Sequence, residues 1–242
     1  MTHKSIILLL ITIVSILMSC KKDTTTPTNS PSSNSQGIDA QIYAFKEIFL
    51  NNVSSGYDIH SAIFYGATPT SSSVPSVYVG TVSVNGVALK MDNSNPPGPI
   101  YIDTTYSIPG SVYQINVSGS SQFPAGTLQY GQNFPMFNDT SLIPSVVQLS
   151  TGINMLFNNC ITTDSVSVTL DDGNSHVFSK KYGVLNNQLY LIVTPTELSG
   201  FTQTTGGSIS IDMVNMSSTL VGTKNYFIIL EKRYNKMNVQ FN

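Results

Sequence analysis

Residues 164–181 read Asp-Ser-Val-Ser-Val-Thr-Leu-Asp-Asp-Gly-Asn-Ser-His-Val-Phe-Ser-Lys-Lys. Within the expected strand Asp164–Leu170, polar and apolar side chains alternate from Ser165 onward, and a period of two is typical of a strand with one buried face. Asp171-Asp172-Gly173-Asn174 then has the composition of a tight turn, because Asp, Gly and Asn suit turn backbones. His176 to Lys181 is the returning strand, so the stretch predicts a β-hairpin.

The rest of the second half repeats this pattern of short strands and turn signals. The expected strands, in chain order, are Ser145–Leu149, Ile153–Phe157, Asp164–Leu170, His176–Lys181, Gln188–Val193, Ser208–Val214 and Asn225–Tyr234. This many short strands in about 100 residues is typical of a β-sandwich. The last strand is strongly apolar from Tyr226 to Leu230, so we expect it to be central and buried on both faces.

The number and spacing of these strands resemble an immunoglobulin-like domain over Leu142 to Asn242. A helical turn expected at Thr196-Glu197-Leu198, between the fifth and sixth strands, adds to the resemblance. The chain has no Trp and no Cys pair for such a core, so it departs from the antibody type. The resemblance implies that residues 141–242 form an immunoglobulin-like β-sandwich. Fimbrillin-like pilus subunits are a rival sandwich architecture.

The first half, residues 38–140, is expected to be a second β-rich domain, which makes the fold all-β with two sandwiches in tandem. Asn85-Gly86 between apolar runs is a strong hairpin signal, because a type I′ turn needs positive φ at both central residues. Gln122 to Thr140 is rich in Gly, Pro and Asn, and we expect it to connect the two domains. The other expected strands are Gln41–Leu50, Tyr57–Tyr65 and Val112–Ser118.

The first residues have the pattern of an export signal. Ile6 to Met18 is almost wholly aliphatic, follows Lys4 and is shorter than the roughly 20 residues of a membrane-spanning helix. Leu17-Met18-Ser19-Cys20 resembles the lipobox of bacterial lipoproteins, although a smaller residue is usual at the position of Met18. The resemblance implies that residues 1–19 are a signal peptide and that Cys20 carries a diacylglyceryl group and a further acyl chain such as palmitate. An ordinary secretory signal with an incidental Cys20 is the alternative.

Residues 20–37 then form the lipidated Cys and a tether without apolar side chains other than proline, which we expect to be disordered. Charged residues make up only 10% of the chain, with Ser, Thr and Asn in their place. The net charge is −2 and no basic run occurs, so nucleic acid is not an expected partner. The low charge and the Lys21-Lys22-Asp23 start resemble envelope lipoproteins of Bacteroidota, which implies attachment to the outer membrane. Surface and periplasmic orientations both stay open.

Motifs for catalysis and for bound metals are missing from the sequence. It has no Gly-x-Ser-x-Gly, no zinc-ligand spacing, no phosphate loop and no dinucleotide fingerprint, so we expect no cofactor and no enzyme activity. Asp171, Asp172 and Asn174 cluster side-chain oxygens that suit calcium. The spacing of an EF-hand is absent, however, and a hairpin turn explains the same residues. Cys160 is expected to be a buried, unreactive side chain.

Aromatic residues in loops are the candidate ligand contacts. Flat rings beside Asn, Gln and Ser suit carbohydrate or protein surfaces, whereas packing between the domains is the structural alternative. The candidates are Tyr101, Tyr106, Phe123, Tyr130, Phe134 and Phe137.

Three classes of function follow from these features. We expect a lipid-anchored, non-catalytic binding module for a glycan or for an envelope or host protein. The alternatives are a structural or pilus-like subunit that assembles through strand edges, and a glycan-acting enzyme with an unidentified carboxylate pair.

Overall fold

A computed structural model describes residues 37–51, 56–65, 75–94, 98–106, 108, 110, 112–132 and 134–242. These residues are nearly all β, and the predicted all-β sandwich class is confirmed. The predicted signal peptide, Cys20 and the tether as far as Gln36 lie outside the described residues. Within the described ranges, no helix has the length and apolar character needed to span a membrane.

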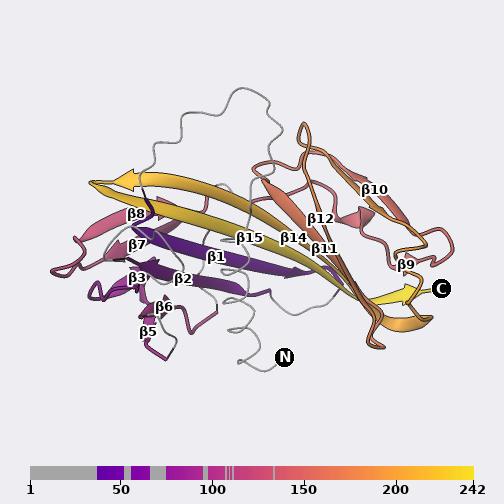
Figure 1. Cartoon of the computed structure of the whole chain (residues 1–242), viewed down its shortest axis with the longest axis horizontal. Helices are drawn as coiled ribbons and strands as arrows, with labels where there is room; N and C mark the ends of the chain where they lie inside the picture. Colours follow the sequence, from indigo (N-terminus) through magenta and orange to yellow (C-terminus); the bar gives the residue numbers. More distant parts are fainter. Residues whose placement is uncertain are drawn as a thin grey trace.

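The described strands form one large sheet and two small ones (Figure 1). The large sheet has the strand order β12 (Val177–Tyr182), β11 (Ser165–Asp171), β14 (Thr204–Val221), β15 (Lys224–Phe241), β1 (Ala40–Phe49), β2 (Asp58–Phe64), β6 (Ile100–Ile102) and β5 (Lys90–Asp92), with β9 (Val146–Val147) beside β15. The four-stranded sheet has the order β4 (Val87–Ala88), β3 (Val82–Val84), β7 (Tyr113–Val117) and β8 (Gly126–Tyr130). The two-stranded sheet pairs β10 (Ile153–Phe157) with β13 (Leu189–Val193), and a short 3₁₀ turn, η1, spans Thr140–Leu142.

The hairpin of β14 and β15 is much longer than the sequence predicts. Each strand has 18 residues, and together they run the length of the molecule (Figure 1). The expected strand Ser208–Val214 ends before β14 does. Beyond Val214, polar residues such as Asn215, Ser217 and Thr219 interrupt the alternation of apolar and polar side chains that marks a strand in the sequence. Pairing with β15 holds that segment extended all the same. The prediction that β15 is central is confirmed, because it lies between β14 and β1.

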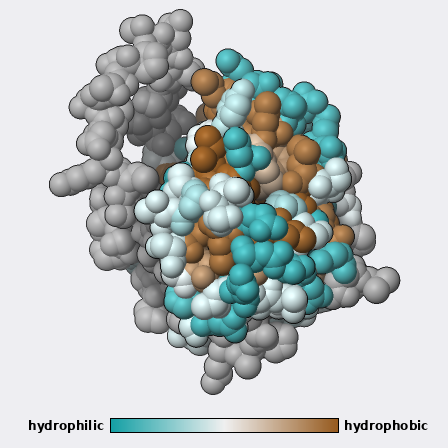
Figure 2. All heavy atoms as spheres, turned by 90° about the vertical axis from the view of Figure 1, so that its right-hand side faces the viewer, coloured by the Kyte–Doolittle hydropathy of each residue, from teal (hydrophilic) through white to brown (hydrophobic). Residues whose placement is uncertain are grey.

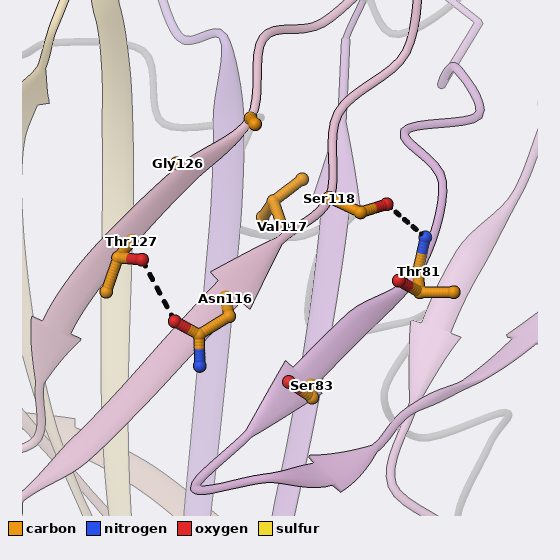
Figure 3. A pocket seen from close by; sticks show the side chains of 8 residues that line it. Thr81, Ser83, Asn116, Val117, Ser118, Gly126 and Thr127 are labelled. Atoms are coloured by element: carbon orange, nitrogen blue, oxygen red, sulfur yellow. Dashed lines mark hydrogen bonds between the residues drawn. The ribbon is translucent and has the colours of Figure 1, made fainter.

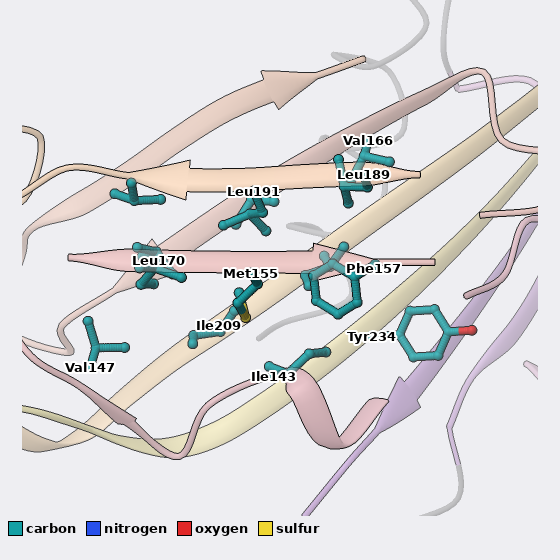
Figure 4. Packing of buried hydrophobic residues seen from close by; sticks show 14 of the residues in the cluster. Ile143, Val147, Met155, Phe157, Val166, Leu170, Leu189, Leu191, Ile209 and Tyr234 are labelled. Atoms are coloured by element: carbon teal, nitrogen blue, oxygen red, sulfur yellow. The ribbon is translucent and has the colours of Figure 1, made fainter. Parts of the chain in front are cut away.

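Both small sheets pack on one face of the large sheet, which we call the covered face. The four-stranded sheet closes a first core against β1, β2 and the start of β15, with Phe64, Tyr113, Ile115 and Ile228 among its members. The two-stranded sheet closes a second core against β11, β14 and the end of β15, with Phe157, Leu191, Ile211 and Tyr234 among its members (Figure 4). One sheet therefore supports both cores. The division into tandem domains and the immunoglobulin-like topology stay predictions.

Several local predictions agree with the described backbone. The expected strands Gln41–Leu50 and Tyr57–Tyr65 correspond to β1 and β2. Asn85 and Gly86 have φ of 48° and 82° and join β3 to β4 in the predicted hairpin. The stretch Gln122–Thr140, expected to connect two domains, instead contains β8, which pairs with β7. Its glycines and prolines lie at the ends of that strand, so the composition concealed it.

The end of the molecule formed by the second half displays apolar patches among hydrophilic ones (Figure 2). Exposed large apolar residues in this half include Ile161, Val177, Leu185, Tyr190 and Ile192. Single exposed apolar side chains are ordinary on protein surfaces, so these residues carry no functional argument by themselves.

Candidate functional site

A shallow depression lies on the outer face of the four-stranded sheet. Side chains alternate along its strands, so that Val82, Ile115 and Val117 face the first core and their neighbours face outward. The depression has a volume of about 450 Å³. The residues that line it are Thr81, Ser83, Asn116, Val117, Ser118, Ala125, Gly126 and Thr127 (Figure 3).

The lining of the depression is uncharged and rich in hydrogen-bonding groups. Asn116 Oδ1 accepts hydrogen bonds from Thr127 Oγ1 at 2.9 Å and from Gln114 Nε2 at 3.1 Å. These bonds orient the amide, and no described residue accepts a hydrogen bond from its Nδ2 group. Ser118 Oγ accepts a hydrogen bond from the Thr81 amide at 2.7 Å, which fixes the opposite side. The depression therefore offers preoriented hydroxyl and amide groups to a neutral, polar ligand.

Gly80 allows the chain before β3 to pass close to the end of β7, beside the depression. At Gly80, beside Thr81, φ is +82°, and an added Cβ would lie 2.2 Å from Ser118 Oγ. Only glycine avoids that clash and adopts this backbone without strain. The close approach of the β3 and β7 ends, and with it the Thr81–Ser118 bond, thus depends on Gly80.

Sequence reasoning did not find this site. Thr81, Ser83, Asn116 and Thr127 look like ordinary solvent-facing positions of amphipathic strands. The signal available in the sequence was that none of these positions is charged, which is unusual for an outward sheet face. The whole chain is poor in charged residues, however, so this signal did not single out these positions.

Most of the aromatic residues expected to contact a ligand are buried instead, which corrects the expectation of an exposed aromatic surface. Tyr101, Phe123, Tyr130 and Phe137 are at most 4% exposed. Rings with so little accessible surface pack against other groups and cannot stack on a ligand from solvent. Phe134 is also partly buried, against the first core, and Tyr106 is partly exposed with φ of 57°.

The four buried rings have identifiable packing partners. The Tyr101 hydroxyl donates a hydrogen bond of 3.1 Å to the Gly80 carbonyl oxygen and accepts one of 3.0 Å from the Val79 amide. Phe123 packs edge-on against Phe64 in the first core, with ring centroids 5.0 Å apart. Phe137 belongs to the second core, so these rings do not form one surface.

Tyr130 belongs to a buried polar network between the large sheet and the four-stranded sheet. His60, which is fully buried, has Nδ1 at 2.8 Å from the Tyr130 hydroxyl and Nε2 at 2.9 Å from Asp58 Oδ1. The Tyr113 hydroxyl donates to Asp58 Oδ2 at 2.6 Å, and Lys46 Nζ lies 3.4 Å from the same oxygen. Burial would raise the pKa of Asp58, but its bonds to His60 and Tyr113 and the Lys46 charge lower it overall. The network keeps Asp58 ionised and ties the two sheets together.

The Asp171–Asn174 turn uses its side chains to fix its own backbone. Asp172 is fully buried; its Oδ1 accepts from the Asn174 and His176 amides, and its Oδ2 accepts from the Thr202 amide. Burial alone would raise the pKa of Asp172, but these backbone bonds hold it well below the usual range. Asp171 Oδ1 accepts a hydrogen bond from the Gly173 amide.

Both carboxylates of this turn therefore accept hydrogen bonds from the backbone. The described residues contain no group of three or more His, Cys, Asp or Glu placed to hold a metal ion. The turn explains the residues that suggested calcium.

A second polar cluster lies on the other face of the large sheet. Glu231 is 3% exposed and accepts a hydrogen bond of 2.8 Å from the Tyr43 hydroxyl, while Arg233 pairs with Asp212. Burial, and then the charge of Asp212, raises the pKa of Glu231 to about 7. This acidic group is separate from the depression, whose lining contains no carboxylate.

Comparison with known proteins adds no relative to this description. No protein-family model matches the chain, and a search of characterised proteins found no match.

Replacement of Phe137 by alanine tests whether this ring is a core residue. Phe137 packs 4.5 Å from both Phe157 and Tyr234, centroid to centroid, and large-to-small changes at such sites cost about 3–5 kcal/mol. We expect Phe137→Ala to lower the free energy of unfolding by that amount in urea titrations. Tyr78→Ala, at a ring that is 53% exposed, should change it by less than about 1 kcal/mol. Equal effects of the two variants would contradict the assignment.

Replacement of Glu231 by glutamine tests the raised carboxyl pKa. The folded state holds the proton to about pH 7, whereas the unfolded state releases it near the ordinary 4.5. The stability that depends on the protonated carboxyl is therefore complete below pH 4.5 and is lost as pH rises through 7. Glu231→Gln should remove this loss, on the order of 3 kcal/mol, and flatten the unfolding free energy between pH 5 and 8.

The matched control for this experiment is Glu197→Gln. Bonds from Lys180 and the Thr194 amide lower the pKa of Glu197 to about 2. Its replacement should leave the slope between pH 5 and 8 unchanged. A wild-type profile that is already flat in this interval would show that the pKa of Glu231 is ordinary.

Proposed function

We propose that this chain is a lipid-anchored protein of the bacterial cell envelope that binds a neutral glycan, without catalysis, through the depression on the four-stranded sheet. The anchor is proposed from the lipobox-like Leu17-Met18-Ser19-Cys20, and the outer membrane from the resemblance to Bacteroidota lipoproteins. The ligand class is proposed from the chemistry of the depression.

The single observation that supports a glycan is the lining of uncharged hydroxyl and amide groups in fixed orientations. Sugars present many hydroxyls, each a donor and an acceptor, and bind well to preoriented groups of the same kind. An anionic ligand would meet no positive charge among the lining residues, and an apolar one would offer no acceptor to the Asn116 Nδ2 group. A neutral glycan satisfies the lining best.

The depression lies on an outward sheet face that a glycan can reach without rearrangement of the core. Ser83, Asn116 and Thr127 are on paired strands, which hold binding groups more precisely than loops do, and Thr81 directly precedes β3. The half-exposed Tyr78 lies close to the Ser118 end of the depression. Its carbonyl oxygen accepts a hydrogen bond of 2.8 Å from Ser120 Oγ. It is an exposed aromatic residue that the sequence analysis did not select.

Glycan-array binding with matched variants tests the ligand class. Asn116→Ala should weaken binding of a neutral glycan about tenfold, because a polar ligand loses one oriented hydrogen-bonding group. Thr127→Val should weaken it as well, since it removes the hydroxyl that orients Asn116 and keeps the side-chain shape. Thr151→Val, at an exposed threonine outside the depression, is the control and should bind like wild type. An array without neutral-glycan binding, or binding that all three variants retain, would reject the depression as a glycan site.

Metabolic labelling with a palmitate analogue tests the anchor. The wild-type chain should incorporate the label and sediment with membranes, because two or more acyl chains hold a protein firmly. Cys20→Ser should lose both properties. Cys160→Ser, at the other cysteine, should keep them. Label on Cys20→Ser, or an unlabelled wild-type protein, would favour the ordinary secretory signal.

A further inference from the structure

We propose that the depression binds an internal stretch of an extended, neutral, β-1,4-linked polysaccharide, which lies across the strands of the four-stranded sheet. The inference rests on the proposed glycan function and adds to it the linkage of the ligand and the direction in which it lies. It comes from the outward face of this sheet, which continues the chemistry of the depression beyond the lining residues.

Outward side chains of the four-stranded sheet lie in rows that cross its strands. In the first row, Ser83 of β3 pairs with Asn116 of β7, and Asn116 pairs with Thr127 of β8 (Figure 3). In the second row, Gln114 of β7 is opposite Gln129 of β8. Neighbouring strands are ~4.8 Å apart, which is close to the length of one sugar unit in an extended chain. A chain laid along the first row therefore meets a new hydrogen-bonding side chain at each unit.

Both rows are open to solvent and uncharged. Thr127, Gln114 and Gln129 are exposed, and Ser83 and Asn116 are partly exposed. Gln114 Nε2 donates to Asn116 Oδ1 at 3.1 Å, so Asn116 Nδ2 is a donor and Gln114 Oε1 an acceptor for a ligand. Sugar hydroxyls both donate and accept, and one sugar unit can therefore satisfy the two amides together.

The described side chains at the two ends of the first row are small and exposed. At one end, Ser83 pairs with Ala88 of β4, which contributes only a methyl group. At the other end, Thr127 is on β8, the last strand of this sheet. A chain can continue past both of these residues. This geometry suits an internal stretch of a polysaccharide better than a terminal sugar, which a closed pocket would hold.

The arrangement in a row favours one type of linkage. Side chains in register on paired strands form a nearly straight line, because strand pairing fixes their spacing. A β-1,4-linked chain is an extended ribbon and can follow such a line over several units. An α-1,4-linked chain of the same sugar coils, so it leaves the line after one or two units. The row therefore selects the extended chain.

Isothermal titration calorimetry with oligosaccharides of defined length tests the inference. The probes are β-1,4-linked oligomers of glucose, mannose and xylose, from one to six units. At least one hexamer should bind, and its affinity should exceed that of its disaccharide at least tenfold, because only the longer chain spans the row. The α-1,4-linked glucose hexamer is the control and should bind at least tenfold more weakly than the best β-1,4-linked hexamer.

The outcomes separate this inference from the glycan function. A monosaccharide or an α-1,4-linked hexamer that binds as tightly as the best β-1,4-linked hexamer would overturn the extended chain and leave the glycan function in place. Binding of a neutral glycan on the array without binding of any β-1,4-linked hexamer would do the same. No binding of any neutral glycan would overturn both.

Substitution at one end of the row tests the direction of the chain. Ser83→Ala should lower the ratio of hexamer to disaccharide affinity about threefold, because a disaccharide held by Asn116 and Thr127 does not need the Ser83 hydroxyl. Ser150→Ala, at an exposed serine outside this sheet, is the matched control and should leave the ratio unchanged. Circular dichroism of both variants must show the wild-type fold. A folded Ser83→Ala protein with the wild-type ratio would overturn the proposed direction across the strands.

Discussion

The pairing of β14 with β15 is the constraint on which the rest of the structure depends. Their register continues from Val221↔Lys224 to Thr204↔Phe241, so one hairpin supports both hydrophobic cores. The remaining strands of the large sheet extend from this hairpin, with β11 and β12 on one side, β1, β2, β6 and β5 on the other, and β9 beside the end of β15. A break in this pairing would therefore separate the two cores as well as disturb each.

The alternation along β15 shows how one strand serves two cores. Tyr226, Ile228 and Leu230 face the first core, and Tyr234 faces the second, so the inward residues here have even numbers. Further on, Val239 and Phe241 face the second core, so the inward residues there have odd numbers. The change occurs at Asn238, where φ is 55° and the register against β14 shifts, as in a β-bulge. Asn adopts this left-handed backbone more readily than most residues, so the chain tolerates the bulge without glycine.

The sequence predicted the class of fold and most strand positions, because period-two alternation and turn residues are local signals. Ile153–Phe157 is reproduced as β10, and the Asn85-Gly86 turn has the expected backbone. The length of β14 was beyond local reasoning, since Asn215, Ser217 and Thr219 are held by pairing with a distant strand. The burial of Tyr130 and Phe137 was also hidden, because composition marks an aromatic side chain but not its neighbours in space. The depression escaped for a related reason: its side chains become a site only when β3, β7 and β8 align.

The proposed binding depression depends on the packing of the first core. It lies on the outer face of the four-stranded sheet, whose inner face packs on the covered face of the large sheet. Val82, Ile115 and Val117 face the core from the strands that carry Ser83 and Asn116 on their outer side. The core contacts therefore fix the strands, and the strands fix the outward hydroxyl and amide groups. A change that loosens the first core should weaken the depression as a binding site even though it touches none of the lining residues.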